Sequence, residues 1–408
     1  MRISKIIAGI MAFCIMGMAC PVVNGVSDKI TAYASSETEY TEGTYEHLTY
    51  KNYGDYIEIS GCDELATYVI IPSEIDGVPV TGIGNSAFYY CKGLISVTIP
   101  DSVTSIGDFA FGSCTSLVSV NIPDSVKSIG EYALYDTPWF KGKQQQNPLV
   151  IVNDILIDGS TCSGDIIIPD GITSISDFAF SGCTELTSII IPDSIESIGI
   201  GVFSECTGLI SVTIPDSVAI IDEMAFSECT SLISITIPDS VATIGITAFF
   251  ECKNLESVTI PDNVMNIHCG AFCNCENLTS ITILNPDCEI VYDKSTISNG
   301  WDININNINA YFNGTIYGYE NSTAQVYAEK CGYKFESLGK YPENQTPTGD
   351  INGDGEFNVA DAVMLNKYLL GGSCEELSEW QNADLCADGK LDSFDLCMMK
   401  KKLVEDLV

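Results

Sequence analysis

The chain has 408 residues, which is long enough for more than one domain and for a sizeable hydrophobic core. Its 55 Asp and Glu residues outnumber the 18 Lys and Arg residues, so the formal net charge is −37. This charge argues against nucleic acids and anionic membrane surfaces as partners, because both are recognised by basic patches. It is compatible with a secreted protein kept soluble by its charge, or with one that binds cations.

The chain begins with the features of an export signal. Arg2 and Lys5 precede an apolar run that ends at Ala19, which is too short and wrongly flanked to span a membrane. The tripeptide Ala-Tyr-Ala that ends at Ala34 offers a cleavage site. The sequence therefore predicts a signal peptide over residues 1–34, a secreted protein, and no stable insertion into a membrane.

The following part of the chain repeats with a period of 23 residues. Each unit carries apolar residues in the spacing L-x-x-[VI]-x-I, as at Leu94, Val97 and Ile99. This is the spacing of a leucine-rich repeat strand, and such units bury a continuous core only by stacking on their neighbours. The interval from Ile122 to Ile168 is 46 residues, twice the period, so it contains one degenerate copy. The tripeptide Ile-Pro-Asp marks the period, beginning at Ile99, Ile122, Ile168, Ile191, Ile214, Ile237 and Ile260.

Cysteine recurs with the same period. In an exported chain this many cysteines would ordinarily predict disulfides. Stacked units, however, hold their Cα–Cβ vectors parallel at the spacing of the units, whereas a disulfide needs Cβ atoms about 3.8 Å apart. We therefore expect buried thiols that act as small hydrophobic groups. This thiol column consists of Cys91, Cys114, Cys183, Cys206, Cys229, Cys252 and Cys275, and it follows a Phe column of Phe111, Phe180, Phe203, Phe226, Phe249 and Phe272.

The full pattern, L-x-S-[VI]-x-I-P-D-S-V-x-x-I-G-x-x-A-F-x-x-C, resembles the bacterial surface-antigen (BspA-type) leucine-rich repeat family. The resemblance covers about Gly61–Leu338 and implies an α/β solenoid of 23-residue units that is used for extracellular binding. We assign residues 35–338 to this solenoid and its caps. The segment Asn321–Leu338 resembles the family's closing cap, with a helix-start signal at Asn321-Ser322 and a helix-stop glycine at Gly332.

Two polar columns are expected on the exposed side of the repeat strands. They could hydrogen-bond an extracellular protein or a polysaccharide, or they could form an inert soluble sheet. Because they lack aromatic platforms for sugars, the affinity could lie instead at Tyr89-Tyr90, Phe250, or Trp139-Phe140. One column is Ser96, Ser119, Ser188, Ser211, Ser234, Ser257 and Ser280; the other is Thr98, Asn121, Ile190, Thr213, Thr236, Thr259 and Thr282.

Catalysis has little support in the sequence. A nucleophilic relay needs a base within hydrogen-bond reach, yet the chain has only His47 and His268. The regular period leaves no long insertion in which to build an active site, so we predict that the protein is not an enzyme. The segment HCGAFCNC, from His268 to Cys275, could hold zinc or a Cys269–Cys273 disulfide. We favour plain packing, with Cys275 pointing inward and His268 facing solvent.

Residues 339–348 form a linker with two prolines, and an acidic motif follows. The segment DINGDGEFNVAD matches an EF-hand-like calcium loop, with Gly355 at the sharp turn. DLCADGKLDSFD repeats the motif 34 residues later, with Gly389 at the turn. Cys386 stands at its third position and is a poor calcium ligand, so the second site should be weaker. The expected ligands are Asp350, Asn352, Asp354, Glu356, Asn358 and Asp361 in the first loop, and Asp384, Cys386, Asp388, Lys390, Asp392 and Asp395 in the second.

Each loop leads into an apolar segment that we expect to be helical, Ala362–Leu370 and Leu396–Val404, without a helix entering the first loop. This duplicated loop-and-helix unit resembles a type I dockerin over residues 349–408. The resemblance implies a small all-α domain of paired F-hand motifs that binds two Ca²⁺ ions and a scaffoldin cohesin. The family's cohesin-binding positions fall on Val359, Ala360, Asn366, Lys367, Ser393, Phe394, Lys400 and Lys401.

Together these features predict a secreted, non-catalytic subunit of a cellulosome. The dockerin would attach it to a scaffoldin cohesin in a calcium-dependent way, while the repeat surface binds an extracellular protein or polysaccharide. Two alternatives remain open. One is a cellulosomal enzyme that acts on plant polysaccharide with an unrecognised carboxylate site near Trp139, and the other is a protein inhibitor or adhesin.

Overall fold

The computed structural model describes residues 39–304 and 307–341, together with 351, 357, 359–369, 385, 395–396 and 398–400. The predicted signal peptide therefore lies outside the described residues. The chain divides into two compact units, Met1–Gly339 and Lys340–Val408. Within the described residues, no helix combines the length and the apolar character needed to cross a bilayer.

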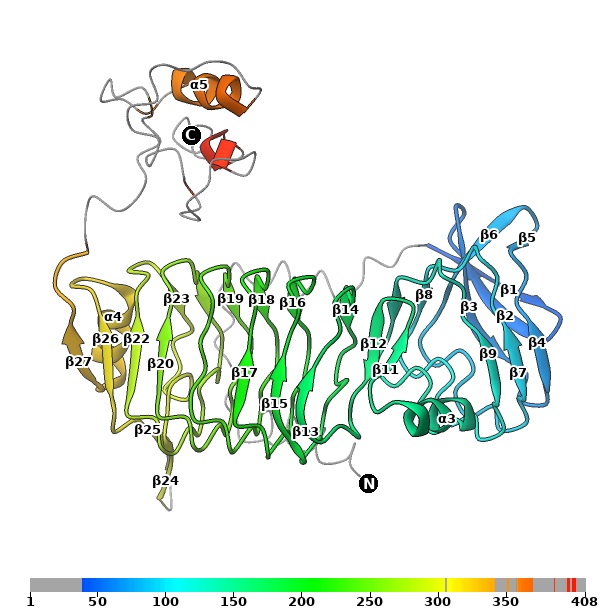
Figure 1. Cartoon of the computed structure of the whole chain (residues 1–408), viewed down its shortest axis with the longest axis horizontal. Coiled ribbons are helices and arrows are strands. Elements are labelled where there is room, and N and C mark those ends of the chain that lie inside the picture. Colours follow the sequence, from blue (N-terminus) through cyan, green and yellow to red (C-terminus); the bar gives the residue numbers. More distant parts are fainter. Residues whose placement is uncertain are drawn as a thin grey trace. The chain divides into compact units, whose positions relative to one another are not determined.

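The first unit is the predicted repeat solenoid, with about 12 turns in its described part (Figure 1). The repeating residues form two columns of short parallel strands. The first column carries the L-x-x-[VI]-x-I residues and consists of β4 (Tyr68–Ile70), β7 (Ser96–Thr98), β9 (Ser119–Asn121), β13 (Gly164–Ile167), β15 (Leu186–Ile190), β17 (Ser211–Thr213), β20 (Ser257–Ile260), β22 (Ser280–Ile283), β26 (Thr315–Gly318) and β27 (Lys334–Ser337).

The second column carries the two residues before the turn position that is glycine in many of the units. Its strands are β3 (Ile57–Cys62), β6 (Val78–Ile83), β8 (Ser105–Ile106), β10 (Ser128–Ile129), β12 (Ile155–Asp158), β14 (Ser174–Ile175), β16 (Ser197–Ile198), β18 (Ile220–Ile221), β19 (Thr243–Ile244), β21 (Asn266–Ile267) and β23 (Glu289–Ile290). The chain returns between the columns mostly through turns. The repeat class is confirmed, and little of it is helical.

In the regular units, strand pairing follows the sequence period. Ser96 pairs with Ser119, and Ser257 pairs with Ser280, so equivalent residues of successive units lie side by side. The inward Leu, Ile and Val residues are buried. The Phe column stacks along the same axis, as shown by Phe203 and Phe226, whose ring centroids are 5.3 Å apart. Each unit therefore completes the core of its neighbours.

The thiol column is buried, as the sequence predicts. The thiols of Cys206, Cys229 and Cys252 donate hydrogen bonds of 3.1–3.2 Å to Phe carbonyl groups of the preceding unit. Among the described cysteines there is no disulfide, so Cys269 and Cys273 are not joined to each other. Burial raises the pKa of Cys206 and Cys252, and raises that of Cys114 to about 12. They therefore act as small hydrophobic groups that also satisfy a buried carbonyl.

Both ends of the solenoid are capped. At the N-terminal end, β1 (Thr41–Tyr45) and β2 (Leu48–Asn52) extend the second column as antiparallel strands, and β5 (Glu74–Ile75) pairs with β6. At the other end, α4 (Thr323–Cys331) packs near β26 and β27. The Ser322 hydroxyl accepts a hydrogen bond from Gln325 N, and Gly332 ends the helix with φ of 75°. The predicted closing helix is confirmed at both boundaries.

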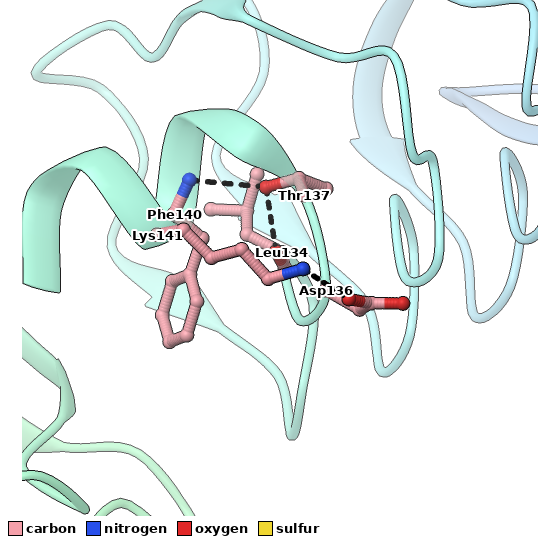
Figure 2. Close-up of polar contacts among 5 residues, drawn as sticks. All are labelled: Leu134, Asp136, Thr137, Phe140 and Lys141. Carbon is pink, nitrogen blue, oxygen red and sulfur yellow. Dashed lines mark hydrogen bonds and ion pairs between the residues drawn. The ribbon is translucent and has the colours of Figure 1, made fainter.

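The degenerate copy contains a helix that the repeat pattern does not predict. α3 (Pro138–Gln146) precedes β11 (Val150–Val152), which pairs with β12. Figure 2 shows how α3 begins: the Thr137 hydroxyl accepts from Phe140 N at 3.1 Å and donates to the Leu134 carbonyl at 2.8 Å. Lys141 pairs with Asp136 beside this cap. A Thr-Pro start is a known helix signal.

One hairpin also interrupts the repeat. β24 (Gly300–Asn304) and β25 (Asn307–Tyr311) form an antiparallel pair between β23 and β26. The regular period had predicted no long insertion, and this expectation is wrong at this position. The signal was available, because the apolar strand positions Ile283 and Ile316 are separated by more than one 23-residue period.

Candidate functional site

The second unit has a small apolar core to which both copies of the loop motif contribute. Ala362 and Leu365 of α5 (Val359–Leu369) are buried together with Leu396 and Met399. These residues form two pairs with the 34-residue separation of the motif, since Ala362 corresponds to Leu396 and Leu365 to Met399. The described residues after Asp395 are helical, so each loop leads into a helix as predicted. Equivalent residues of the two copies thus share one core.

The last residue of each loop is a fully buried carboxylate. Asp361 and Asp395 are both 0 % exposed. One carboxylate oxygen of Asp361 accepts a hydrogen bond of 3.0 Å from the backbone N–H of Ile351, the second residue of the first loop. This bond ties the end of the loop to its beginning. Burying an ionised carboxylate is costly unless it is paired or coordinates a metal.

These carboxylates fit the calcium assignment in type and position. Ca²⁺ prefers several oxygen ligands, and the twelfth loop residue supplies one of the carboxylates. The remaining ten expected ligands lie outside the described residues: Asp350, Asn352, Asp354, Glu356, Asn358, Asp384, Cys386, Asp388, Lys390 and Asp392. The expected cohesin-binding residues Ser393, Phe394 and Lys401 also lie outside them.

Helix α5 presents an exposed surface beside the buried Asp361. The predicted binding residues Val359, Ala360, Asn366 and Lys367 are all exposed, as is Lys400 on the second helical segment. Sequence reasoning missed two further exposed residues, Val363 and Tyr368, which are 60 % and 43 % exposed. Val363 lies one turn after Val359, so the helical spacing could have identified it.

The polar columns of the solenoid are mostly exposed. Thr213, Thr236 and Thr259 face solvent, and the serines beside them are exposed or half-buried. The carboxylate of Asp165 accepts hydrogen bonds from Thr187 and Ser188, which holds the start of one column in place. The aromatic residues proposed as alternative binding positions differ in their exposure to solvent. Tyr89 and Tyr90 are exposed, Phe250 and Trp139 are half-buried, and Phe140 is buried.

The segment from His268 to Cys275 packs into the solenoid. Cys269, Cys273 and Cys275 are buried, and the Cys275 thiol donates to the Phe249 carbonyl. His268, expected to face solvent, is half-buried, and burial lowers its pKa. Among the residues that the structure describes, no three His, Cys, Asp or Glu side chains are arranged to hold a metal.

Comparisons with known proteins match both units. The BspA type Leucine rich repeat region matches residues 81–151 and 151–279 in six copies, and the Dockerin type I domain matches residues 348–404. A comparison with the curated proteins found no match.

Several solved structures of leucine-rich repeat proteins are similar. One, from Bacteroides ovatus, is 24% identical and covers 76% of this chain and 79% of its own, with a TM-score of 0.37. The T. pallidum protein TpLRR is 24% identical, and the match covers 47% of this chain and 91% of TpLRR, with a TM-score of 0.31. The pneumococcal vaccine antigen PcpA is 14% identical, and the match covers 74% of this chain and 98% of PcpA, with a TM-score of 0.38.

The repeat period, the parallel strand columns and the paired loop-and-helix copies agree with the two matched families. The chain is a BspA-type leucine-rich repeat protein with a C-terminal type I dockerin domain.

Proposed function

We propose that this protein is a secreted, non-catalytic subunit of a cellulosome. Its dockerin attaches it to a scaffoldin cohesin in a calcium-dependent way, and its solenoid binds an extracellular protein or polysaccharide. The observation that carries the proposal is the pair of buried carboxylates, Asp361 and Asp395, which close two equivalent loops on one shared core. The leucine-rich repeat and dockerin families are themselves non-catalytic.

Calcium links loop order to docking in this proposal. Type I dockerins bind calcium, and the ion supplies the positive charge that buried carboxylates require. Asp361 fixes one end of the first loop through the Ile351 N–H and begins the first turn of α5 at the other. A correctly closed loop thereby sets the position of the helix. Two sites are proposed, the second weaker because Cys386 replaces an oxygen ligand.

The proposed cohesin surface is the exposed side of α5 and of the second helical segment. It combines the apolar side chains of Val359 and Val363 with the polar or charged ones of Asn366 and Lys367. An apolar centre with polar groups around it is typical of specific protein interfaces. Lys400 adds a positive charge from the second copy.

A pull-down tests the calcium-dependent attachment. The full chain is immobilised and exposed to the culture supernatant of its source organism, and mass spectrometry identifies captured scaffoldin by its cohesin modules. Capture is expected with calcium, should disappear with chelator, and should return when calcium is restored. The double variant Asp350→Ala, Asp361→Ala should also lose capture.

A matched variant controls for the loss of two negative charges. Asp239→Ala with Asp262→Ala removes two exposed carboxylates from the solenoid and should leave capture unchanged. Capture that persists in chelator and in the Asp350/Asp361 variant would refute calcium-dependent docking. Turnover of plant polysaccharide by the purified chain would separately refute the non-catalytic assignment.

A further inference from the structure

The degenerate copy interrupts the second strand column. β10 is the last strand of the sheet that begins at the N-terminal cap, and β12 and β14 belong to the next sheet. The two sheets are joined here by a side chain, since the Ser176 hydroxyl donates a hydrogen bond of 2.8 Å to the Ile129 carbonyl. A cavity of about 400 Å³ lies along this part of the column.

The polar lining of this cavity is acidic. Glu58, Asp108 and Asp177 contribute carboxylates, and Asn85 contributes an amide. None of the lining residues is Lys, Arg or His. Hydrogen bonds hold two of the acids in place, because Asp108 accepts from the N–H of Glu131 and Asp177 accepts from that of Ile200.

The negative charge of this region is poorly compensated. Burial and the carboxylates of Asp108 and Asp177 raise the pKa of Glu131 to about 7. The acids are not arranged as a metal site within the described residues. They belong to separate turns of the solenoid, from β3 to the residues after β14. An elongated ligand with separate positive groups therefore fits this arrangement better than a single cation does.

A continuous aromatic stripe follows the same turns. Tyr89, Phe109, Tyr132 and Phe178 make successive ring contacts, with centroids 6.2, 5.5 and 6.4 Å apart. Tyr135 extends the stripe to the side of Tyr132 and is 49 % exposed. Phe109 and Phe178 directly follow the cavity residues Asp108 and Asp177 in the chain. The stripe and the acidic cavity thus share the same loops.

Backbone geometry alone does not require these aromatic residues. Phe109, Tyr132 and Phe178 have φ values of 53°, 51° and 57°, a left-handed conformation that suits glycine and is uncommon for bulky side chains. At the equivalent position of other turns the chain uses Ser86, Gly201, Met224, Thr247 and Gly270, all with positive φ. The turns around the acidic cavity therefore differ from the others in carrying aromatic side chains at this position.

We propose that the cavity and the aromatic stripe bind an extended, arginine-bearing segment of a partner protein. This inference rests on the proposed role of the solenoid as the ligand-binding part. A guanidinium group stacks on aromatic faces and forms paired hydrogen bonds with carboxylates, so it satisfies both features of the site. The net charge of −37 also attracts a basic segment over longer distances. A neutral polysaccharide would leave the carboxylate charge uncompensated.

Fluorescence anisotropy with the full chain tests this proposal. The probe is a labelled peptide, Gly-Arg-Gly-Arg-Gly-Arg-Gly, and its Gln-for-Arg counterpart serves as the neutral probe. Only the arginine peptide should bind. Asp108→Asn with Asp177→Asn should weaken its binding about tenfold or more, because each Asn keeps an acceptor oxygen but loses the charge. Tyr89→Leu should weaken it as well.

Two controls separate the site from general electrostatics and from folding. Asp216→Asn with Asp239→Asn removes the same charge at exposed positions elsewhere, and Tyr68→Leu removes an exposed ring outside the stripe. Both variants should bind like the unaltered chain. Equal weakening by both acidic pairs, or no binding of the arginine peptide, would overturn the proposal. If cellohexaose binds, and only the Asp108/Asp177 substitutions abolish its binding, the ligand of this site would be a glycan and not a basic segment.

Scaffoldin capture is measured on the same variants. Capture that persists while arginine binding is lost would show that the dockerin is intact, and thermal unfolding of the solenoid equal to that of the unaltered chain would show that the substituted solenoid is folded. Loss of capture in every form of the chain would instead contradict the proposed attachment and would leave the arginine result to be judged by itself.

Discussion

The Phe column allows a quantitative test of the stacked architecture. Phe226 is 0 % exposed and stacks between Phe203 and Phe249, with centroid distances of 5.3 and 5.4 Å. Phe88 is equally buried but stacks only on Phe111, at 4.8 Å. Replacement of either residue by Leu keeps an apolar side chain in the core and removes the ring contacts.

The expected difference follows from the number of ring contacts. Each aromatic pair contributes about 0.5–1.5 kcal/mol beyond its burial. Phe226→Leu should therefore lose about 1–3 kcal/mol of stacking energy and Phe88→Leu about half as much. Both variants share a similar cost for the change in side-chain shape, so the difference between them isolates the second ring contact.

Hydrogen exchange measured by mass spectrometry is the suitable assay. A solenoid is stabilised by contacts between neighbouring turns, so its turns can open separately. Exchange should accelerate most in the peptides around Phe226 and its two neighbours, while exchange in the dockerin stays unchanged. Equal destabilisation by Phe226→Leu and Phe88→Leu would refute the idea that ring stacking along the column adds to burial.

Four further predictions follow from individual contacts. Thr137→Ala should cost about 1 kcal/mol and increase proteolysis of α3, because it removes the helix cap, whereas Thr137→Ser should retain the capping oxygen. Glu131 has a pKa of about 7 in the folded protein against 4.5 ordinarily, so the folded state holds a proton between these values that the unfolded state has lost. Stability measured by denaturant unfolding should therefore fall as pH rises from about 4.5 to 7, and Glu131→Gln should abolish this fall and be the more stable form above pH 7. Iodoacetamide should modify Cys252 only after unfolding, because burial raises the pKa of its thiol, and mass spectrometry of native and unfolded samples checks this. Val363→Asp should weaken cohesin binding about tenfold or more in surface plasmon resonance, while exposed Val118→Asp on the solenoid should leave it unchanged.

Much of the solenoid could be predicted because its contacts are periodic. Each inward residue meets its own equivalent in the next turn, so one apolar pattern describes the core along most of its length. Ser322 and Gly332 also gave the boundaries of the closing helix, since capping depends on local residues. The paired loops were recognisable because calcium ligation fixes residue types at fixed spacings.

The irregular parts could not be derived from the period. The hairpin of β24 and β25 and the helix α3 depart from it, and the half-buried state of His268 depends on neighbouring turns. In the dockerin, the positions taken from the resemblance included Val359 but not Val363, although Val363 lies one helical turn later and the helical spacing could have identified it.

The sequence by itself determined the repeat, its inward residues and the dockerin with its duplicated motif, because each depends on residue types at short, fixed separations. Only the tertiary structure decided that Glu58, Asp108 and Asp177 line one cavity beside the aromatic stripe. Glu58 and Asp108 come from different turns of one sheet, and Asp177 comes from beyond the break in the strand column, where Ser176 bonds to Ile129. The relative positions of these acids depend on how the turns stack next to the irregular copy, so they cannot be read from the sequence of any one repeat.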